Sequence, residues 1–228
     1  MKGICFIEPL FHKVVKGEKT QTRRIIVSRT GYFQVERDCV SRDIIDIWQT
    51  DDNEWCGENL IPVNPKYKVG EKVYLKEPYA ETCDEYGSPL IAYRFDNAAF
   101  YLIRKDENGD YYQLNTIKKP VSTNWTLDNF PACGEWKNKL FMPQWAARYF
   151  IEITAVRAER LQDISAGDCM KEGIHTMTGG LLFVNEINNI VYPTPQRAYA
   201  ALINNISGKG TWERNPFVWV YDFKLIQE

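Results

Sequence analysis

The chain has 228 residues, a formal net charge of −2 and a pI near 5.9, which excludes the strongly basic balance of proteins that hold long nucleic acids by their phosphates. Hydrophobic residues make up 44% and charged residues 25%, the composition of a globular protein. The N-terminus does not have the pattern of a secretory signal and no apolar run reaches membrane-spanning length, so we expect a cytoplasmic protein without membrane association. The six cysteines lie apart without a C-x-x-C pair, which predicts free thiols.

The first predicted elements are a short helix over 9–16, which Gly17 ends, and a strand within TQTRRIIV (20–27). Between them lies GEKTQTRR (17–24), where an ammonium group, hydroxyls and guanidinium groups follow a glycine. Such a composition suits an anion-binding site. Charge runs usually face water, however, so the residues alone favour an exposed turn.

The middle of the chain predicts strands with two excursions. Residues 28–66 are mixed polar and aromatic and predict a hairpin or loop excursion, whereas 72–77 form a strand. Turn-prone DEYGSP and DENGD separate strand-like segments within 84–136, which predicts an insertion built of hairpins. The segment that follows Trp145 predicts a short helical turn and then a central strand.

The last third of the chain predicts two helices and a final strand. Ser165 and Asp168 have the spacing of a capping box, which starts a helix that ends at Glu172. A second helix starts at Thr194, and residues 217–226 form a strand whose odd positions make one apolar face, with Trp219 in the core. Strands interrupted by isolated helices predict one α+β domain over 1–228, with a mostly antiparallel sheet curved into a small barrel.

Two motifs are set aside. GKGT (208–211) resembles a phosphate-binding loop, but the earlier glycine is missing and the loop follows a helix instead of preceding one, which excludes an NTPase. His12 and His175 lack accompanying carboxylates and cysteines, so we expect neither a metal site nor a cofactor.

Four separated blocks, in this order, resemble the ASCH family: G-x-K-T-x-T-R-R, VGEKVYLKEPYA, MPQWAARYFIEITAVRAERLQDIS with EGI, and GKGTWERNPFVWVYDFKLI. The resemblance is to the branch common in bacteriophages and prophages, and it leaves the hairpin insertions uncovered. It implies a PUA-like, mostly antiparallel β-barrel with a few flanking helices, a fold whose relatives bind RNA or modified bases.

One small bacterial member of the family is an amidohydrolase that removes the acetyl group from acetylated cytidine with a Lys, a Thr and a Glu. The resemblance places these roles on Lys19, Thr22 and Glu172. A lysine desolvated by burial can take a proton and activate Thr22 or a water, after which Glu172 protonates the leaving amine, without a metal. Arg24 matches an arginine of that enzyme, whereas Arg23 stands where the enzyme has an apolar residue.

The same cleft offers a second hypothesis, a non-catalytic module that binds single-stranded RNA, a modified nucleoside or a modified nucleotide. The residues predicted to contact such a ligand are Thr20, Arg23, Arg24, Glu77, Tyr79 and Trp212. A third is a phage protein that engages a host protein through its insertion.

Overall fold

A computed structural model describes most of the chain, namely residues 1–27, 32–38, 44–50, 61–84, 86–104, 112–114, 135–185, 187 and 189–226. The chain divides into two compact units. Unit 1 comprises Met1–His12, Lys72–Ile151 and Leu225–Glu228, and unit 2 comprises Lys13–Glu71 and Glu152–Lys224. The single domain expected over 1–228 stays a prediction.

The sheet of unit 2 carries the GEKTQTRR segment. Its strands are β2 (Gln21–Ile25), β3 (Tyr32–Arg37), β4 (Ile44–Thr50), β5 (Ile61–Pro62), most of β11 (Phe150–Arg160) and most of β15 (Phe217–Ile226). Strand β15 lies between β11 and β2, and β4 pairs with β11, β3 and β5. The antiparallel register of β2 and β15 sets Gln21 opposite Asp222 and Thr22 opposite Tyr221.

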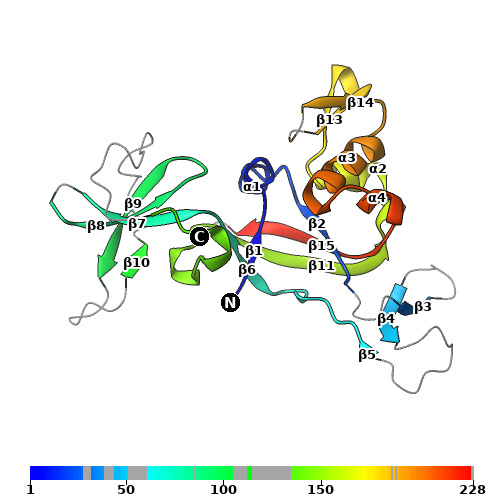
Figure 1. Cartoon of the computed structure of the whole chain (residues 1–228), viewed down its shortest axis with the longest axis horizontal. Helices are drawn as coiled ribbons and strands as arrows, with labels where there is room; N and C mark the ends of the chain where they lie inside the picture. Colours follow the sequence, from blue (N-terminus) through cyan, green and yellow to red (C-terminus); the bar gives the residue numbers. More distant parts are fainter. Residues whose placement is uncertain are drawn as a thin grey trace. The chain divides into compact units, whose positions relative to one another are not determined.

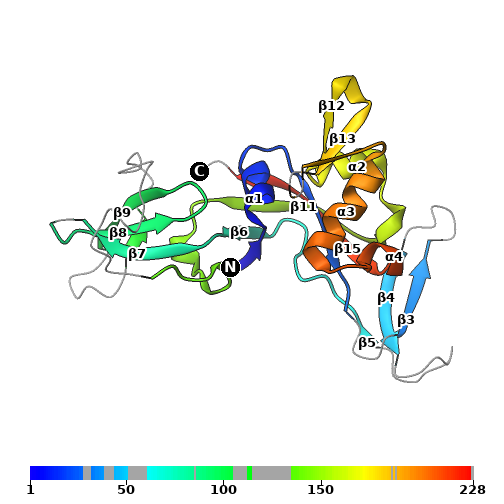
Figure 2. The same cartoon turned by 45° about the horizontal axis from the view of Figure 1, so that its top comes forward.

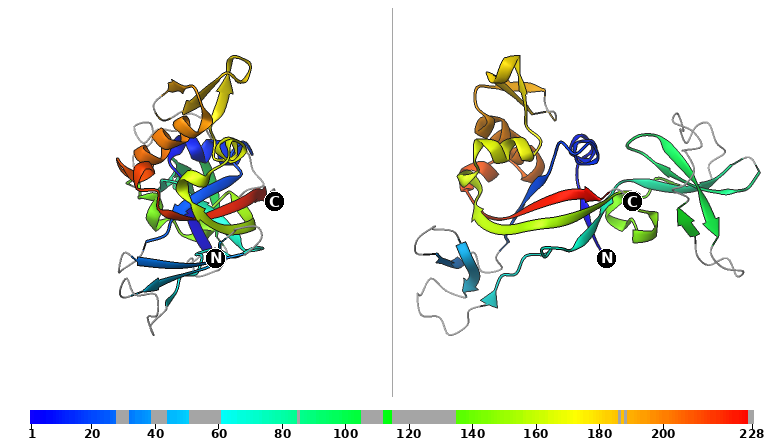
Figure 3. Two further views of the ribbon diagram at one scale, coloured as in Figure 1. Left: turned by 90° about the vertical axis from the view of Figure 1, so that its right-hand side faces the viewer. Right: turned by 180° about the vertical axis from the view of Figure 1, so that it is seen from behind.

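The helices of unit 2 lie on one side of β11 and β15, and β3 to β5 lie on the other (Figures 1 and 3). They are α2 (Ala166–Lys171), α3 (Pro195–Ser207) and α4 (Thr211–Arg214), with 3-10 turns η4 (Leu161–Asp163) and η5 (Thr178–Gly180). The predicted caps are confirmed: the Ser165 hydroxyl accepts from the Asp168 amide, and the Thr194 hydroxyl accepts from the Arg197 amide. Helix α1 (Glu8–Val15) confirms the predicted N-terminal helix to within a residue.

A small antiparallel sheet packs against α3 (Figure 2). Its strands are β12 (His175–Met177), β13 (Leu182–Asn185) and β14 (Ile190–Tyr192), with β13 in the middle. These three strands were not predicted from the sequence.

Unit 1 holds two groups of strands. Strand β1 (Lys2–Cys5) pairs in parallel with β6 (Lys72–Lys76). An antiparallel four-stranded sheet has the order β10-β9-β8-β7. These strands and two 3-10 turns have the bounds β7 (Tyr79–Cys83), β8 (Pro89–Tyr93), β9 (Ala98–Arg104), β10 (Tyr112–Leu114), η2 (Lys139–Phe141) and η3 (Gln144–Ala146).

Hairpins therefore occupy the described part of the predicted insertion over 84–136, although the sheet already begins at Tyr79. The predictions for 105–111 and 115–134, and those for 28–31, 39–43 and 51–60 in the first excursion, lie outside the described residues.

The final strand has the predicted apolar face and a second buried face. Phe217, Tyr221 and Phe223 are buried as expected, and Trp219 packs half-buried on the core cluster of unit 2. Val218 and Val220, on the other face, are also fully buried, which the sequence did not predict. Strand β15 sits between β11 and β2, and the residues on both of its faces are covered.

The fold is α+β, with mostly antiparallel strands in several sheets and few helices. Within the described residues β2 pairs only with β15, so the strand pairing does not close into the predicted barrel. In that same part of the chain, no helix has the length and apolar character to cross a bilayer.

Candidate functional site: a buried lysine–glutamate pair

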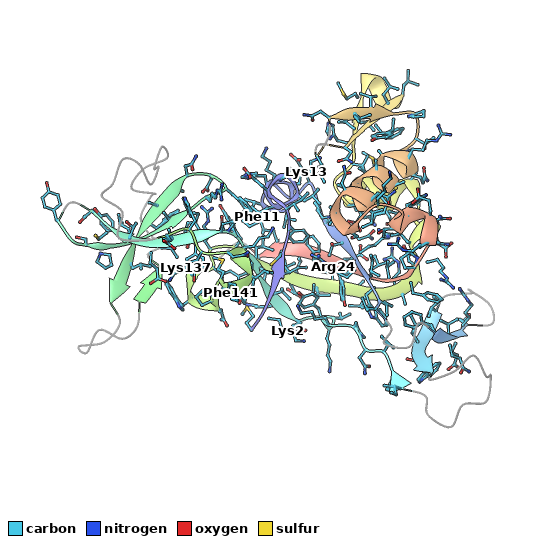
Figure 4. All side chains as sticks on the ribbon, in the orientation of Figure 1. Lys2, Phe11, Lys13, Arg24, Lys137 and Phe141 are labelled. Carbon is cyan, nitrogen blue, oxygen red and sulfur yellow. The ribbon has the colours of Figure 1, made fainter. Side chains whose placement is uncertain are left out.

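Lys19 lies in the turn between α1 and β2, and backbone hydrogen bonds fix this turn. Gly17 has a φ of 75°, a left-handed conformation that glycine adopts without strain. The amides of Glu18 and Lys19 both donate to the Lys13 carbonyl, at 2.8 and 3.1 Å. Figure 4 labels Lys13 and Arg24, which precede and follow Lys19 along the chain.

The next residue, Thr20, ties the turn to two other elements. Its amide donates to the carbonyl of Lys171 at the end of α2, and its carbonyl accepts from the amide of Phe223 in β15. Thr20 thus contributes its backbone to the site's architecture, and it brings Lys19 to the C-terminus of α2.

Glu172 is the residue that caps the C-terminus of α2. The ammonium of Lys19 lies 2.5 Å from its carboxylate oxygen Oε2 and 2.8 Å from its backbone carbonyl. Lys19 is 1% exposed and Glu172 is 3% exposed. The structure therefore brings together two of the three predicted catalytic residues, 153 positions apart, in a contact shielded from water.

Arg23 holds the second carboxylate oxygen of Glu172. Its Nη1 donates to Glu172 Oε1 at 3.1 Å, its Nε and Nη2 donate to Glu159 Oε1, and Nη2 also donates to Asp168. Nη1 donates in addition to Gln21 Oε1 at 2.5 Å. Because buried charges need partners, this set of acceptors is what permits a guanidinium side chain with no exposed surface.

Arg157 and Gln21 surround this centre and join it to β15. Arg157 donates to Glu159, Asp168 and Asp222, and Gln21 donates to Asp168 and Asp222. The site is thus a network in which cationic side chains donate to carboxylates, on one face of β2, β11 and β15 and next to α2.

Burial controls protonation in this network. Desolvation lowers the pKa of Lys19; the charge and hydrogen bond of Glu172 oppose that shift, and the positive charges of Arg24 and Arg23 add to it. Burial also disfavours the charge on Arg23, but Glu172 and its other anionic neighbours outweigh this and raise its pKa. Burial raises the pKa of the nearby Cys169 thiol to about 12, so this thiol stays protonated and is a poor nucleophile.

Thr22 lies on the other face of β2. Side chains alternate along a strand, and Gln21 and Arg23 face the network, so Thr22 and Arg24 point the opposite way. The register agrees, because Thr22 is paired with Tyr221, whose hydroxyl accepts from the Lys66 amide on that side. Thr22 therefore does not share the face of β2 on which Arg23 contacts Glu172.

Trp212 reaches the network through another aromatic side chain. It is half-buried in α4, and its ring meets that of Tyr199 edge to face with centroids 6.2 Å apart. The Tyr199 ring lies 5.9 Å from the Arg23 guanidinium. The Tyr199 ring thus connects Trp212 to Arg23.

Glu77 and Tyr79, the remaining predicted ligand contacts, belong to unit 1. Both carboxylate oxygens of Glu77 accept from Arg148, at 2.7 and 2.6 Å. Tyr79 is 4% exposed, packs in the core cluster of unit 1 and lies under the ammonium of Lys137. Each side chain already has partners within its own unit, as core and rim residues do.

Four members of the network were not predicted from the sequence: Arg157, Glu159, Asp168 and Asp222. Asp168 was predicted only as part of the helix cap. A signal was present in the strands: Arg157 and Glu159 are two positions apart in β11, so they share a face, and Asp222 interrupts an apolar run in β15. Polar residues at such interior strand positions indicate a polar network on that face of the sheet.

Among the described residues, no three His, Cys, Asp or Glu side chains gather in a group that could hold a metal ion. No protein-family model matches the chain, and no curated protein or solved structure matches it. The ASCH resemblance therefore stays a prediction carried by the four sequence blocks.

Proposed function

We propose that this protein is an ASCH-type protein with a PUA-like fold that hydrolyses the amide of an acylated cytidine-type base. The contact between Lys19 Nζ and Glu172 Oε2 carries the proposal. The family resemblance selects these two residues from distant parts of the sequence, and the fold gives them a direct, buried hydrogen bond. A pair chosen without reference to the fold has little chance of meeting in this way.

The chemistry follows from the desolvated lysine. Because burial lowers its pKa, Lys19 loses its proton more readily than an exposed lysine, and a neutral amine can take a proton from an attacking water or hydroxyl. The new carbon–oxygen bond forms at the acyl carbon, and the carbon–nitrogen bond to the base breaks. The proton passes from Lys19 through Glu172 to the leaving nitrogen, giving a carboxylic acid and the free amine.

The proposed nucleophile is water. Strand alternation puts Thr22 on the face of β2 opposite to Arg23, the residue that contacts Glu172. Thr22→Val tests this directly: we expect it to retain most of the hydrolysis rate if water attacks, and to abolish hydrolysis if the threonine does.

The deciding experiment measures hydrolysis of acylated cytidines by chromatography, with the wild type, Lys19→Met and Glu172→Gln. We expect each substitution to lower kcat about 100-fold or more, the scale of lost acid–base catalysis. Lys16→Met is the matched control, because Lys16 is an exposed lysine three residues away. Equal rates in the wild type and Lys19→Met would contradict the proposal.

A non-catalytic module that binds single-stranded RNA or a modified base is the second candidate. It is supported by the position of Thr22, which strand alternation puts on the face of β2 opposite to Arg23. Arg24 shares a face with Thr22, so in this case Arg24→Ala should abolish salt-sensitive binding of a labelled single-stranded RNA, without turnover of any acylated base. Absence of binding at low salt would exclude this candidate.

A further inference from the structure

Arg23 has no hydrogen-bond donor left for a ligand. A guanidinium group has five N–H donors, one on Nε and two on each Nη. Nε donates to Glu159, Nη1 to Gln21 and Glu172, and Nη2 to Glu159 and Asp168, so every donor has an acceptor. The exposed fraction of the side chain is 0%. A phosphate or carboxylate ligand would have to displace one of these internal acceptors.

The same contacts divide the Glu172 carboxylate between two cations. Oε1 accepts from Arg23 at 3.1 Å and Oε2 accepts from Lys19 at 2.5 Å. Glu159 and Asp168 hold the guanidinium in place, and Arg157 in turn bridges those two carboxylates. The planar fork of Arg23 thus fixes the plane in which the Glu172 carboxylate lies.

We propose that Arg23 is a positioning residue, which orients the Glu172 carboxylate so that a single oxygen faces Lys19. The expected effect of Arg23 on the hydrolysis rate rests on the proposed function, whereas its expected effect on the protonation of Lys19 does not. Without Arg23, Glu172 can turn both oxygens toward the ammonium, which stabilises the charged lysine. A lysine side chain at position 23 does not restore the arrangement, because three donors on one nitrogen cannot serve acceptors spread around a planar fork.

The test is an NMR titration of the Lys19 side chain in the wild type, Arg23→Lys, Arg23→Met and Arg157→Met. We expect the midpoint for Lys19 to rise by about one pH unit, a tenfold gain in proton affinity, in both Arg23 variants. It should not move in a further variant, Arg197→Met, because Arg197 is an exposed arginine of α3 outside the network, whereas Arg157→Met should give a smaller rise, since Arg157 holds the carboxylates that hold Arg23. The backbone NMR spectrum checks folding, and Arg23→Lys alone carries the test if Arg23→Met does not fold.

Three results would overturn the proposal. The first is an unmoved midpoint in Arg23→Lys, which means that Arg23 acts through its charge alone. The others are an equal shift in Arg197→Met and a lowered midpoint in the Arg23 variants. Where the wild type hydrolyses an acylated cytidine, we further expect both Arg23 variants to lower kcat at least tenfold while KM stays within about twofold. Absence of hydrolysis by the wild type would remove the proposed function and leave the titration result intact.

Discussion

The side chains of Arg148 in unit 1 and Arg23 in unit 2 are both almost fully buried among carboxylates. The two clusters differ in whether a lysine belongs to them. Arg148 donates to Glu77 and Asp96, and its guanidinium lies 4.1 Å from the centroid of the Tyr93 ring. Among the described residues, no lysine forms a hydrogen bond with Arg148, Glu77 or Asp96. The Arg23 cluster includes Lys19, a buried amine whose pKa is lowered by desolvation.

This difference separates a structural ion pair from a site able to transfer a proton. Arginine stays charged at any pH that proteins tolerate, so the Arg148 cluster has no cation that can be neutralised. Lysine changes its protonation state readily when buried. Burial of charge by itself is therefore a weak indicator of function, whereas a titratable cation within such a cluster is a stronger one.

The largest effect expected is on the stability of Arg148→Met. Removing Arg148 leaves Glu77 buried without its cation, which costs about 3–5 kcal/mol in the free energy of unfolding. Urea denaturation measures the loss. Lys137→Met, which breaks the exposed pair with Glu81, is the control and should cost less than about 1 kcal/mol. Similar losses for the two variants would show that the Arg148 cluster does not stabilise the fold.

A smaller effect is expected for Lys19→Met, less than about 2 kcal/mol at neutral pH, because Glu172 keeps Arg23 as its partner. The pH dependence is the sharper measurement. Since the pKa of Lys19 is lowered in the folded protein, the unfolded state binds more protons between that value and the ordinary 10.5. Wild-type stability should therefore rise with pH in this window relative to Lys19→Met. Parallel unfolding curves from pH 7 to 10 would contradict the lowered pKa.

The smallest effect is expected for Asp168→Asn, at the partly exposed edge of the Arg23 cluster. Burial raises the pKa of Asp168, but the hydrogen bond from Gln21 and the charges of Arg157 and Arg23 outweigh it and lower the pKa overall. The stabilisation is therefore present above the ordinary value of 3.8 and is lost as the pH falls through the lowered value.

Asp168→Asn should cost less than about 1 kcal/mol at pH 7, and the difference from the wild type should vanish in acid. Acid titration of the denaturation midpoint checks this, with the exposed Asp163→Asn as the control. A difference that persists unchanged to pH 2 would mean that the Asp168 charge is not responsible.

Much of the fold was predictable because its signals are local. The capping box at Ser165 starts α2, Thr194 and Pro195 start α3, and Gly17 follows the end of α1. These signals were readable because each depends on residues within one helical turn. Two features were not predictable: the division of the chain into two units, and the position of β2 at the end of the described strand order, next to β15. Both depend on which distant strands meet. Burial of Val218 and Val220 was missed for the same reason: alternation assumes one covered face, and β15 has two.

The site shows the same division. By itself, the sequence determined that Gln21 and Arg23 share one face of β2 and that Thr22 and Arg24 share the other, because side chains alternate along every strand. Resemblance to a family singled out Lys19 and Glu172. Only the tertiary structure decided which face of β2 meets α2, because that depends on the pairing of β2 with β15 and on the packing of a helix that lies about 150 residues away along the chain. That packing buried Lys19 against Glu172 and gave every donor of Arg23 an internal acceptor.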